Sequence, residues 1–296
     1  MAVKTYKLTK EAIEKAYSKL LPASSAESKP QYTYWQLKVN GITYTAYTSG
    51  KLVVQGKDIS EAEQFIRDKS IEMAVCNTYP QVGSDEVGCG DYLGPIVVGI
   101  CYIENQQTAE YLLENGLADT KTLTDKKITE LDRLIRKVAR VSTIVLTPNK
   151  YNKWARQNLN MVEMKCQLHR MAWSEMQKKV NLPGLRVIDG FCTEERYKEA
   201  VNGKGVQGIQ FIPKADSNYV SVMCGAVVAR AKFLREITKM ENQWNFILEK
   251  GASDKANMSA VKFIQENGRD NLEKVAKLNF SNTKKVDKYV EVHHLI

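Results

Sequence analysis

The feature that most constrains the fold is an alternation of short apolar runs and amphipathic segments that starts near residue 77. The runs IVVGICYI (96–103), STIVL (142–146) and LRVID (185–189) have the length and the β-branched content of buried strands. Segments with helical spacing lie between them, for example residues 124–140. Strands that alternate with helices predict an α/β fold in which helices layer a sheet.

A smaller unit precedes this alternation. Residues 8–20 place apolar side chains at helical spacing. Three runs rich in β-branched and aromatic residues follow, and Asn40-Gly41 between two of them is a hairpin signal. Residues 60–70 predict a second helix. The order helix, three-stranded meander, helix predicts a small α+β domain over residues 1–77, followed by a larger domain over 78–296.

The chain carries an excess of positive charge, +9 from 43 Lys and Arg against 34 Asp and Glu. Such an excess favours polyanionic partners, because Lys and Arg displace counterions from a phosphate backbone. Six cysteines without a CxxC pair, and three histidines, give a zinc site little to build on and indicate reduced thiols. The lack of a long apolar stretch and of a signal-peptide pattern predicts a soluble, cytoplasmic protein with no membrane partner.

Four acids stand where a strand ends or a helix begins. They are Asp85 and Glu86 before a glycine-rich turn, Asp189 at the end of a later strand, and Asp216 before an apolar-striped helix. In α/β sheets the active site lies at the carboxyl ends of the strands. Carboxylates gathered there would repel one another, and a pair of Mg²⁺ ions about 4 Å apart removes that repulsion. Such a set indicates metal-assisted phosphoryl chemistry rather than acyl transfer.

Each acid also has a plain structural interpretation. Neighbouring side chains of a regular strand face opposite sides, so Asp85 and Glu86 serve one site only where the strand ends or bends. A solvated turn also accounts for this pair, turn formation for Asp189, and helix N-capping for Asp216. Composition and spacing alone leave both interpretations open.

Longer motifs resemble the type 2 ribonucleases H, the group that contains ribonucleases HII and HIII. The run DEVGCGDYLGP is similar to their first strand–turn–strand, and ADTKTLTDKKI, VIDGF and PKADSNYVSVMCGAVVARAKF resemble further family segments in the same order. PNKYN, QNLNMVEMKCQLH and KVAKLNFSNTKK resemble the HIII branch. The N-terminal unit, which includes SGKLVVQGK, is similar to the TATA-box-binding-protein-like domain of that branch.

The resemblance implies a ribonuclease H-like mixed sheet layered by helices, and an endonuclease that cuts the RNA strand of RNA/DNA hybrids. It implies two-metal-ion cleavage with Mg²⁺ or Mn²⁺, 5′-phosphate and 3′-hydroxyl ends, and a hybrid-binding N-terminal domain. The implied catalytic and metal-binding residues are Asp85, Glu86, Asp189 and Asp216. The implied substrate-binding residues are Gly88, Cys89 and Gly90 for ribose 2′-hydroxyls, and Thr120 and Lys121 for phosphate. No feature indicates an obligate protein partner, and a monomer is expected.

The chain departs from the family pattern at Cys89, where relatives carry Thr, Ser, Arg or Lys. Little is lost if the backbone makes the contacts, since glycine lets the chain approach a sugar closely and the 2′-hydroxyl distinguishes RNA from DNA. We therefore expect Cys89→Ser to be nearly silent. We expect Gly90→Val to be severe, because a side chain would meet the sugar in a turn that is expected to use positive φ.

Other functions remain open on the sequence. They are ribonuclease HII-like cleavage at single ribonucleotides in DNA, a non-catalytic hybrid-binding protein, and a different two-metal nuclease or integrase of related fold. His169, on a long predicted helix, is interpreted as structural, and the basic face of residues 126–140 as a solvated face. Half of the aromatic residues between Tyr32 and Tyr47 belong to a core, and the unknown register leaves open which half.

Overall fold

The structure is a computed structural model that describes residues 2–8, 10–67, 75–182 and 184–295. The chain divides into two compact units, Met1–Cys76 and Asn77–Ile296. Each unit has its own hydrophobic core. Along the described chain, no helix combines the length and the apolar character needed to cross a membrane.

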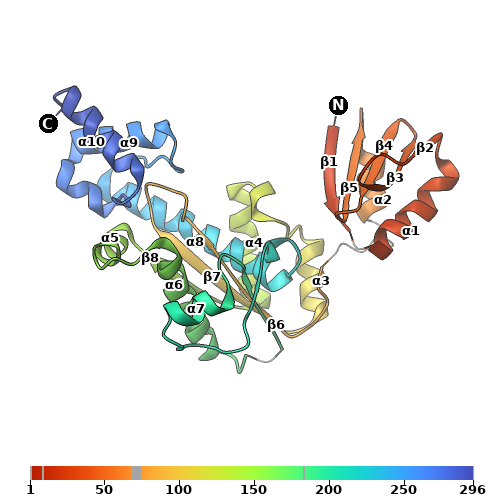
Figure 1. Ribbon diagram of the computed structural model, residues 1–296, viewed down its shortest axis with the longest axis horizontal. Helices are drawn as coiled ribbons and strands as arrows, with labels where there is room; N and C mark the ends of the chain where they lie inside the picture. Colours follow the sequence, from red (N-terminus) through yellow and green to blue (C-terminus); the bar gives the residue numbers. More distant parts are fainter. Residues whose placement is uncertain (1, 9, 68–74, 183, 296) are drawn as a thin grey trace. The chain divides into compact units, whose positions relative to one another are not determined.

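The N-terminal unit is an antiparallel sheet with helices, drawn in red and orange in Figure 1. The sheet order is β1 (Ala2–Lys7), β5 (Lys51–Gly56), β4 (Ile42–Tyr47), β3 (Thr33–Val39) and β2 (Ala26–Ser28). The helices are α1 (Lys10–Leu20), the 3₁₀ turn η1 (Leu21–Ala23) and α2 (Ser60–Arg67). The predicted meander is strands β3 to β5, and a two-residue loop joins β3 to β4 with positive φ at Asn40 and Gly41.

The sequence prediction for this unit lacks both edge strands. Strand β2 is three residues long and fully exposed, so it has no apolar pattern to read. Its partner supplies the pairing, with Ala26 opposite Lys38. Strand β1 likewise pairs only with β5. The predicted second helix begins at Ser60 as expected, and its last three predicted residues, 68–70, lie outside the described residues.

The larger unit contains a mixed five-stranded sheet, which confirms the predicted fold class. Its order is β10 (Gln210–Ile212), β9 (Leu185–Asp189), β6 (Gln81–Val87), β7 (Ile96–Ile103) and β8 (Arg140–Leu146). Strands β9 and β10 run parallel to β6, whereas β7 is antiparallel to both β6 and β8. The helices are α3 (Gln106–Glu114), α4 (Asp125–Val138), α5 (Pro148–Arg156), α6 (Met161–Gln177), α7 (Glu194–Ala200), α8 (Val220–Trp244), α9 (Asp254–Asn267) and α10 (Ser281–Val292), with 3₁₀ turns η2 (Thr120–Thr122), η3 (Ala215–Ser217) and η4 (Arg269–Lys274).

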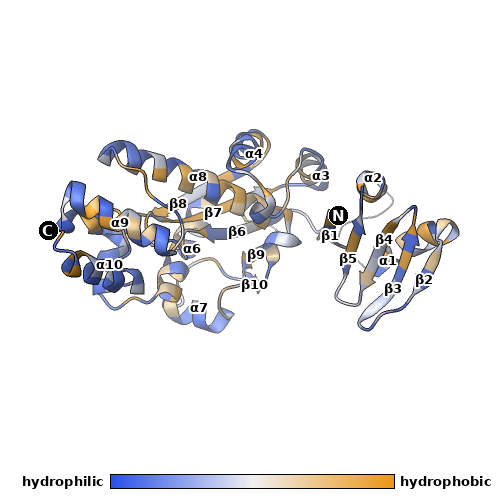
Figure 2. Ribbon diagram, turned by 90° about the horizontal axis from the view of Figure 1, so that it is seen from above, coloured by the Kyte–Doolittle hydropathy of each residue, from blue (hydrophilic) through white to orange (hydrophobic). Residues whose placement is uncertain are grey.

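Two long helices cover opposite faces of this sheet. Helix α8 packs on β6 and β7 from one side, and α6 packs on β7 and β8 from the other. Figure 2 shows the apolar residues of α8 and of the central strands in the interior of the unit. Helix α8 approaches the strands at glycines, since a Cβ added to Gly99 would lie 2.2 Å from the carbonyl oxygen of Gly225. The long helix therefore lies directly against the strand that pairs with β6.

The C-terminal helices α9 and α10 gather with η4 at one end of α8 (Figure 1), around a separate apolar cluster that includes Phe263, Leu272 and Val286. Tyr92 and Leu93, from the loop between β6 and β7, belong to the same cluster. Helices make up most of the C-terminal third of the chain. This segment thus packs against the glycine-rich loop, although more than 150 residues separate them in the sequence.

Candidate active site

Strand β6 presents its two neighbouring acids on opposite faces of the sheet. Both acids lie within regular pairing to β7, with Asp85 opposite Gly99 and Glu86 opposite Val98. Ser84 and Glu86 bond to side chains of α6. On the other face, a Cβ on Gly83 would meet the backbone of α8, so Asp85, two residues on, also faces α8.

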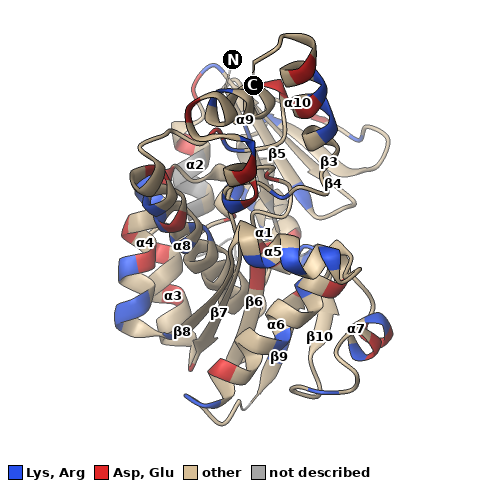
Figure 3. Cartoon of the chain, turned by 90° about the vertical axis from the view of Figure 1, so that its left-hand side faces the viewer, with Lys and Arg blue, Asp and Glu red and all other residues tan. Residues whose placement is uncertain are grey.

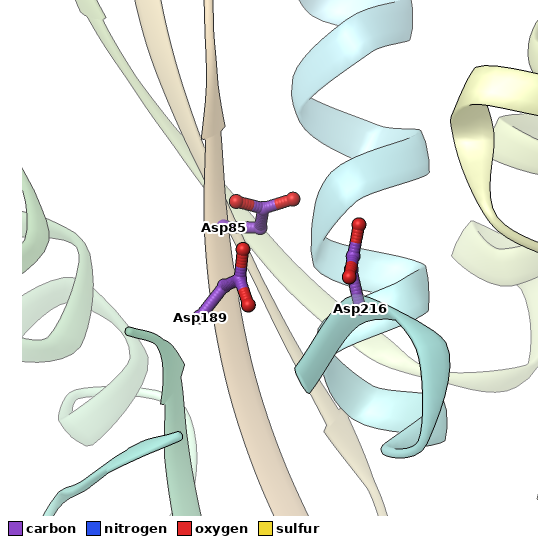
Figure 4. Close-up of side chains that lie close together, drawn as sticks. All are labelled: Asp85, Asp189 and Asp216. Atoms are coloured by element: carbon purple, nitrogen blue, oxygen red, sulfur yellow. The ribbon is translucent and has the colours of Figure 1, made fainter. Parts of the chain in front are cut away.

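Asp85, Asp189 and Asp216 converge on the α8 side. One carboxylate oxygen from each lies within 4.8 Å of the others. Figure 4 shows the three carboxylates directed toward one another from β6, from the end of β9 and from the turn before α8. Burial, with the charges of Glu86 and Asp189 nearby, raises the pKa of Asp85 well above its usual range. Burial and the charge of Asp216 raise the pKa of Asp189 in the same way.

Local backbone geometry fixes the positions of the last two aspartates. The backbone N–H of Ala215 donates to Asp189 Oδ1 at 2.7 Å, which joins the end of β9 to η3. Lys214 takes a left-handed φ of 59° at the start of η3. The next turn buries Asp216, which is 4% exposed. Its carboxylate is then available to the cleft and not to an N-cap, because α8 has no side-chain cap bond.

Two basic side chains reach the same cleft, which has a volume of about 380 Å³ and includes Val87 and Ala226 in its lining. Lys121 Nζ lies 3.0 Å from Asp216 Oδ2, and the lysine side chain is 76% exposed. Arg230 of α8 donates to the carbonyl of Thr120 and, at 2.8 Å, to Asp125. Arg230 therefore anchors η2, the turn that carries both predicted phosphate contacts.

Glu86 lies beside the three aspartates and is held by α6. Its Oε2 is 2.9 Å from His169 Nε2, and its Oε1 forms an ion pair with Lys165. Burial acts to raise the pKa of Glu86, but the bond from His169 and the Lys165 ammonium hold it below its usual value. Of the four predicted acids, the structure thus brings three into one cluster and places the fourth at its edge.

The glycine turn follows the two acids of β6 directly. The left-handed backbone lies at Gly88, with φ of +91°, and not at Gly90 as expected from the sequence. Only glycine adopts this conformation readily. A side chain is also excluded by space, because a Cβ at residue 88 would lie 2.2 Å from the carbonyl oxygen of Pro95. Gly90 faces open space, with nothing within 4 Å of an added Cβ. Burial raises the pKa of Cys89 to about 12, so its side chain is a thiol.

The C-terminal segment holds this turn from behind. Gly251 N–H donates to Asp91 Oδ1 at 2.6 Å, and Tyr92 N–H donates to the carbonyl of Gly251 at 2.8 Å. The fully buried Lys277 donates from Nζ to the carbonyl of Gly94 at 2.7 Å. Burial lowers the pKa of Lys277 to about 8. These bonds fix the loop without using the groups of Gly90.

The aspartate cluster suits a hard divalent cation. Its donors are carboxylate oxygens, the ligand type that Mg²⁺ and Mn²⁺ take. Among the described residues, the positive charges that line or adjoin the cleft are Lys121, Arg230 and Lys165, the last of which pairs with Glu86. Burial and, next to it, neighbouring negative charge raise the pKa values of Asp85 and Asp189, and a bound cation would favour their ionised forms.

Comparison with known proteins places the chain in a family. The family model described as Ribonuclease HII matches residues 82–283, and the model described as Domain of unknown function (DUF3378) matches residues 4–73. Ribonuclease HIII from Oceanobacillus iheyensis is 34% identical over 301 residues, which cover 95% of this chain and 97% of the relative. Ribonuclease HIII from Bacillus velezensis is 33% identical, covering 88% and 90%.

Solved structures agree with these relatives. Bst-RNase HIII in complex with Mn²⁺ superposes with a TM-score of 0.72 at 25% identity, covering 98% of this chain and 100% of that one. Ribonuclease H2 from Pyrococcus horikoshii, at 18% identity and a TM-score of 0.59, shares the fold over 71% of this chain and 98% of its own. The chain belongs to the ribonuclease HIII family. It is therefore a ribonuclease H, a hydrolase of the endoribonuclease class, as the resemblance implied.

Sequence reasoning missed two residues that contact a predicted acid. Lys165 was not singled out, and His169 was interpreted as a structural residue. A signal was present, because Lys165, His169 and Trp173 stand at intervals of four in a helix whose neighbouring positions are apolar.

The basic residues of α4 and α5 are visible in Figure 3. Some of those on α4 make local bonds, such as Arg136 to Asp132.

Proposed function

We propose that the chain cuts the RNA strand of RNA/DNA hybrids with two divalent ions, Mg²⁺ or Mn²⁺, held jointly by Asp85, Glu86, Asp189 and Asp216. The convergence of three carboxylates from three separate elements, within 4.8 Å, carries this proposal; Asp216 is buried, and Asp85 and Asp189 are half-buried. The Mn²⁺ complex of the related Bst-RNase HIII supports divalent-ion use. Cleavage of the bond from phosphorus to the 3′ oxygen leaves 5′-phosphate and 3′-hydroxyl ends.

Divalent ions at such a site activate the attacking water and stabilise the leaving oxygen of the phosphodiester. The chain's own residues supply the rest. The aspartates would hold the ions, and Lys121, at the exposed rim of the cleft, would bind the phosphate backbone. Arg230 keeps Thr120 and Lys121 at that rim.

The glycine turn supplies the selection for RNA in this proposal. The open space at Gly90 lets a ribose approach the backbone, and Gly88 and Cys89 complete the turn. The exposed backbone groups of the turn then bond the 2′-hydroxyl, which DNA lacks. Selection by backbone groups is compatible with a half-buried cysteine in the middle of the turn, since the Cys89 side chain packs against the core cluster.

A single variant tests the metal site. Asp85→Asn keeps the size of the side chain and removes its charge, so the fold is expected to persist while hybrid cleavage falls by roughly a thousandfold or more. End-labelled hybrid, incubated with each ion, gives the rate and the chemistry of the new ends. Wild-type cleavage by this variant at matched ion concentration would refute the assignment.

A second candidate activity is cleavage at single ribonucleotides in DNA. The match of residues 82–283 to the family model described as Ribonuclease HII favours testing it. A duplex that holds one ribonucleotide separates the two activities. We expect efficient cleavage of the continuous hybrid only, because several consecutive riboses are read.

We also propose that residues 1–77 form the hybrid-binding domain and residues 78–296 the catalytic domain of a monomeric enzyme. The open face of the N-terminal sheet is polar and carries Lys38, Thr43 and Gln55 at neighbouring register positions. Lys38 and Gln55 are exposed. Such a face suits contacts to phosphate and sugar, which position a duplex without reading its sequence. Light scattering coupled to size exclusion checks the monomer.

A further inference from the structure

A chain of three hydrogen bonds, two of them buried and the last part-buried, leads from α6 to Glu86. Trp173 Nε1 lies 2.9 Å from Ser84 Oγ, and Ser84 Oγ lies 2.9 Å from His169 Nδ1. His169 Nε2 lies 2.9 Å from Glu86 Oε2. Trp173, Ser84 and His169 are all 0% exposed. The two bonds among these three residues therefore form where water does not compete for them, and the third reaches the edge of the cleft.

The direction of this chain follows from its first member. An indole N–H only donates, so Ser84 Oγ accepts from Trp173. The serine hydroxyl hydrogen is then free to point at His169 Nδ1. A neutral imidazole that accepts at Nδ1 carries its hydrogen on Nε2, so His169 donates to Glu86. An ionised Glu86 only accepts, so Glu86 and Ser84 favour the same tautomer, the one in which His169 offers a donor to the carboxylate.

The other carboxylate oxygen of Glu86 is fixed from one helical turn away. Lys165 pairs with Oε1, and its ammonium lies 3.9 Å from the centre of the Phe191 ring. The same ring stacks on His169 with centroids 5.2 Å apart. Phe191 follows Asp189 by two residues. Lys165 and His169, which hold Glu86, therefore also pack close to Asp189. Both oxygens of Glu86 are engaged, and the carboxylate has a single orientation.

This arrangement is placed in an apolar layer. Met164, Leu168 and Ala172 of α6 belong to the core cluster that surrounds it. Polar groups in such a layer are costly unless every partner is satisfied. The bonds from α6 converge on one carboxylate at the edge of the aspartate cluster, where the orientation of that carboxylate determines its use as a ligand.

We propose that His169 and Lys165 are positioning residues that hold Glu86 for the metal site, with Ser84 and Trp173 supporting the histidine tautomer that donates to it. This rests on the proposed role of Glu86 as one of the four acids. Partners that orient a ligand affect metal affinity or turnover by about 10- to 100-fold. His169 contributes the N–H donor on Nε2. A different side chain that places an N–H donor near Glu86 is therefore expected to keep part of the metal affinity and turnover.

Two substitutions in the full chain test the proposal. His169→Leu removes the donor, and His169→Gln keeps an amide N–H that reaches Glu86. Binding of Mn²⁺, followed by electron paramagnetic resonance of the free ion without substrate, is expected to weaken roughly tenfold in His169→Leu and to recover in His169→Gln. With hybrid, kcat falls in the leucine variant, whereas KM changes little because Glu86 does not bind the duplex.

The outcomes separate the alternatives. Equal Mn²⁺ affinity and kcat in His169→Leu and wild type would overturn the inference, as would equal losses in the leucine and glutamine variants. Asp85→Asn serves as the reference: if it still binds Mn²⁺ and cleaves, the proposed function itself fails. Should His169→Leu not fold, Ser84→Ala replaces it, since it removes the hydroxyl that favours the donating tautomer. Unchanged Mn²⁺ affinity and kcat in folded Ser84→Ala would equally overturn the inference.

Discussion

The two sheets of this protein differ in what their faces contact. In the N-terminal sheet, one face is apolar core, with Trp35, Leu37 and Tyr44 buried, and the other is polar. In the larger unit, α6 and α8 bury both faces of β6 and β7. A sheet with one open face offers a surface to a large ligand. A sheet covered twice offers only its strand ends and the rim of its helices, and there the acids lie.

The comparison also explains how neighbouring acids are used. On a one-sided sheet, one member of an adjacent pair would face water. Between α6 and α8, each member meets a helix, so Asp85 joins the aspartates on the α8 side and Glu86 meets the donors of α6. Because the two side chains point to opposite faces, Asp85 joins the aspartate cluster, and Glu86 is held in place by side chains of α6.

Gly90→Val is expected to have the largest effect on activity after loss of the acids. The free enzyme has room for the side chain, so stability stays within about 0.5 kcal/mol, while the ribose loses its approach. A contact left unmade costs about 2 kcal/mol, or roughly thirtyfold in kcat/KM on a hybrid. Thermal unfolding and steady-state rates measure both. Activity equal to wild type would mean that the ribose does not approach this turn.

Gly99→Ala tests the burial of both faces. A Cβ would lie 2.2 Å from a backbone oxygen of α8, so unfolding free energy is expected to fall by about 3 kcal/mol through overpacking. The matched change on the open N-terminal face, Gln55→Ala, is expected to shift it by less than about 0.5 kcal/mol. Denaturant unfolding of both variants decides. Similar losses in the two would show that the two sheets are not packed differently.

Removal of the N-terminal unit tests its role as a binding surface. A chain that starts at residue 78 is expected to show KM raised about tenfold and kcat nearly unchanged, the pattern of lost uniform binding. The salt dependence of KM weakens as well, because fewer phosphates are neutralised. Circular dichroism controls for folding. An unchanged KM and salt slope would leave the open face without this function.

Cys89→Ser is expected to have the smallest effect. The thiol is partly buried in the core cluster and stays protonated, so the turn keeps its backbone groups when oxygen replaces sulfur. We expect kcat/KM on the hybrid to change by less than about twofold, since isosteric changes in cores usually cost little. A strong loss in a folded Cys89→Ser protein would instead mean that the side chain itself is read.

The sequence by itself determined the alternation of the main strands and helices in the larger unit and the positions of the acids along it. The apolar run that ends on Asp189 and the glycine-rich turn that follows Asp85-Glu86 are local patterns, and the strands that carry these acids are present. The Asn40-Gly41 hairpin is equally local, since its backbone conformation depends on two residues. The edge strands β1 and β2 were not predicted, because each is defined by pairing with a neighbouring strand and not by a pattern in its own residues.

Only the tertiary structure decided which side chains meet. The faces of the N-terminal meander depend on register, which buries Trp35 and Tyr44 and leaves Lys38 exposed. The partners of Glu86 stand about 80 residues away on α6, and the bonds that hold the glycine turn come from residues beyond 250. The apolar periodicity of α6 shows which of its positions are polar, but it does not show which residues of other elements those positions contact. Contacts between distant elements depend on how whole layers pack, and no local pattern encodes that.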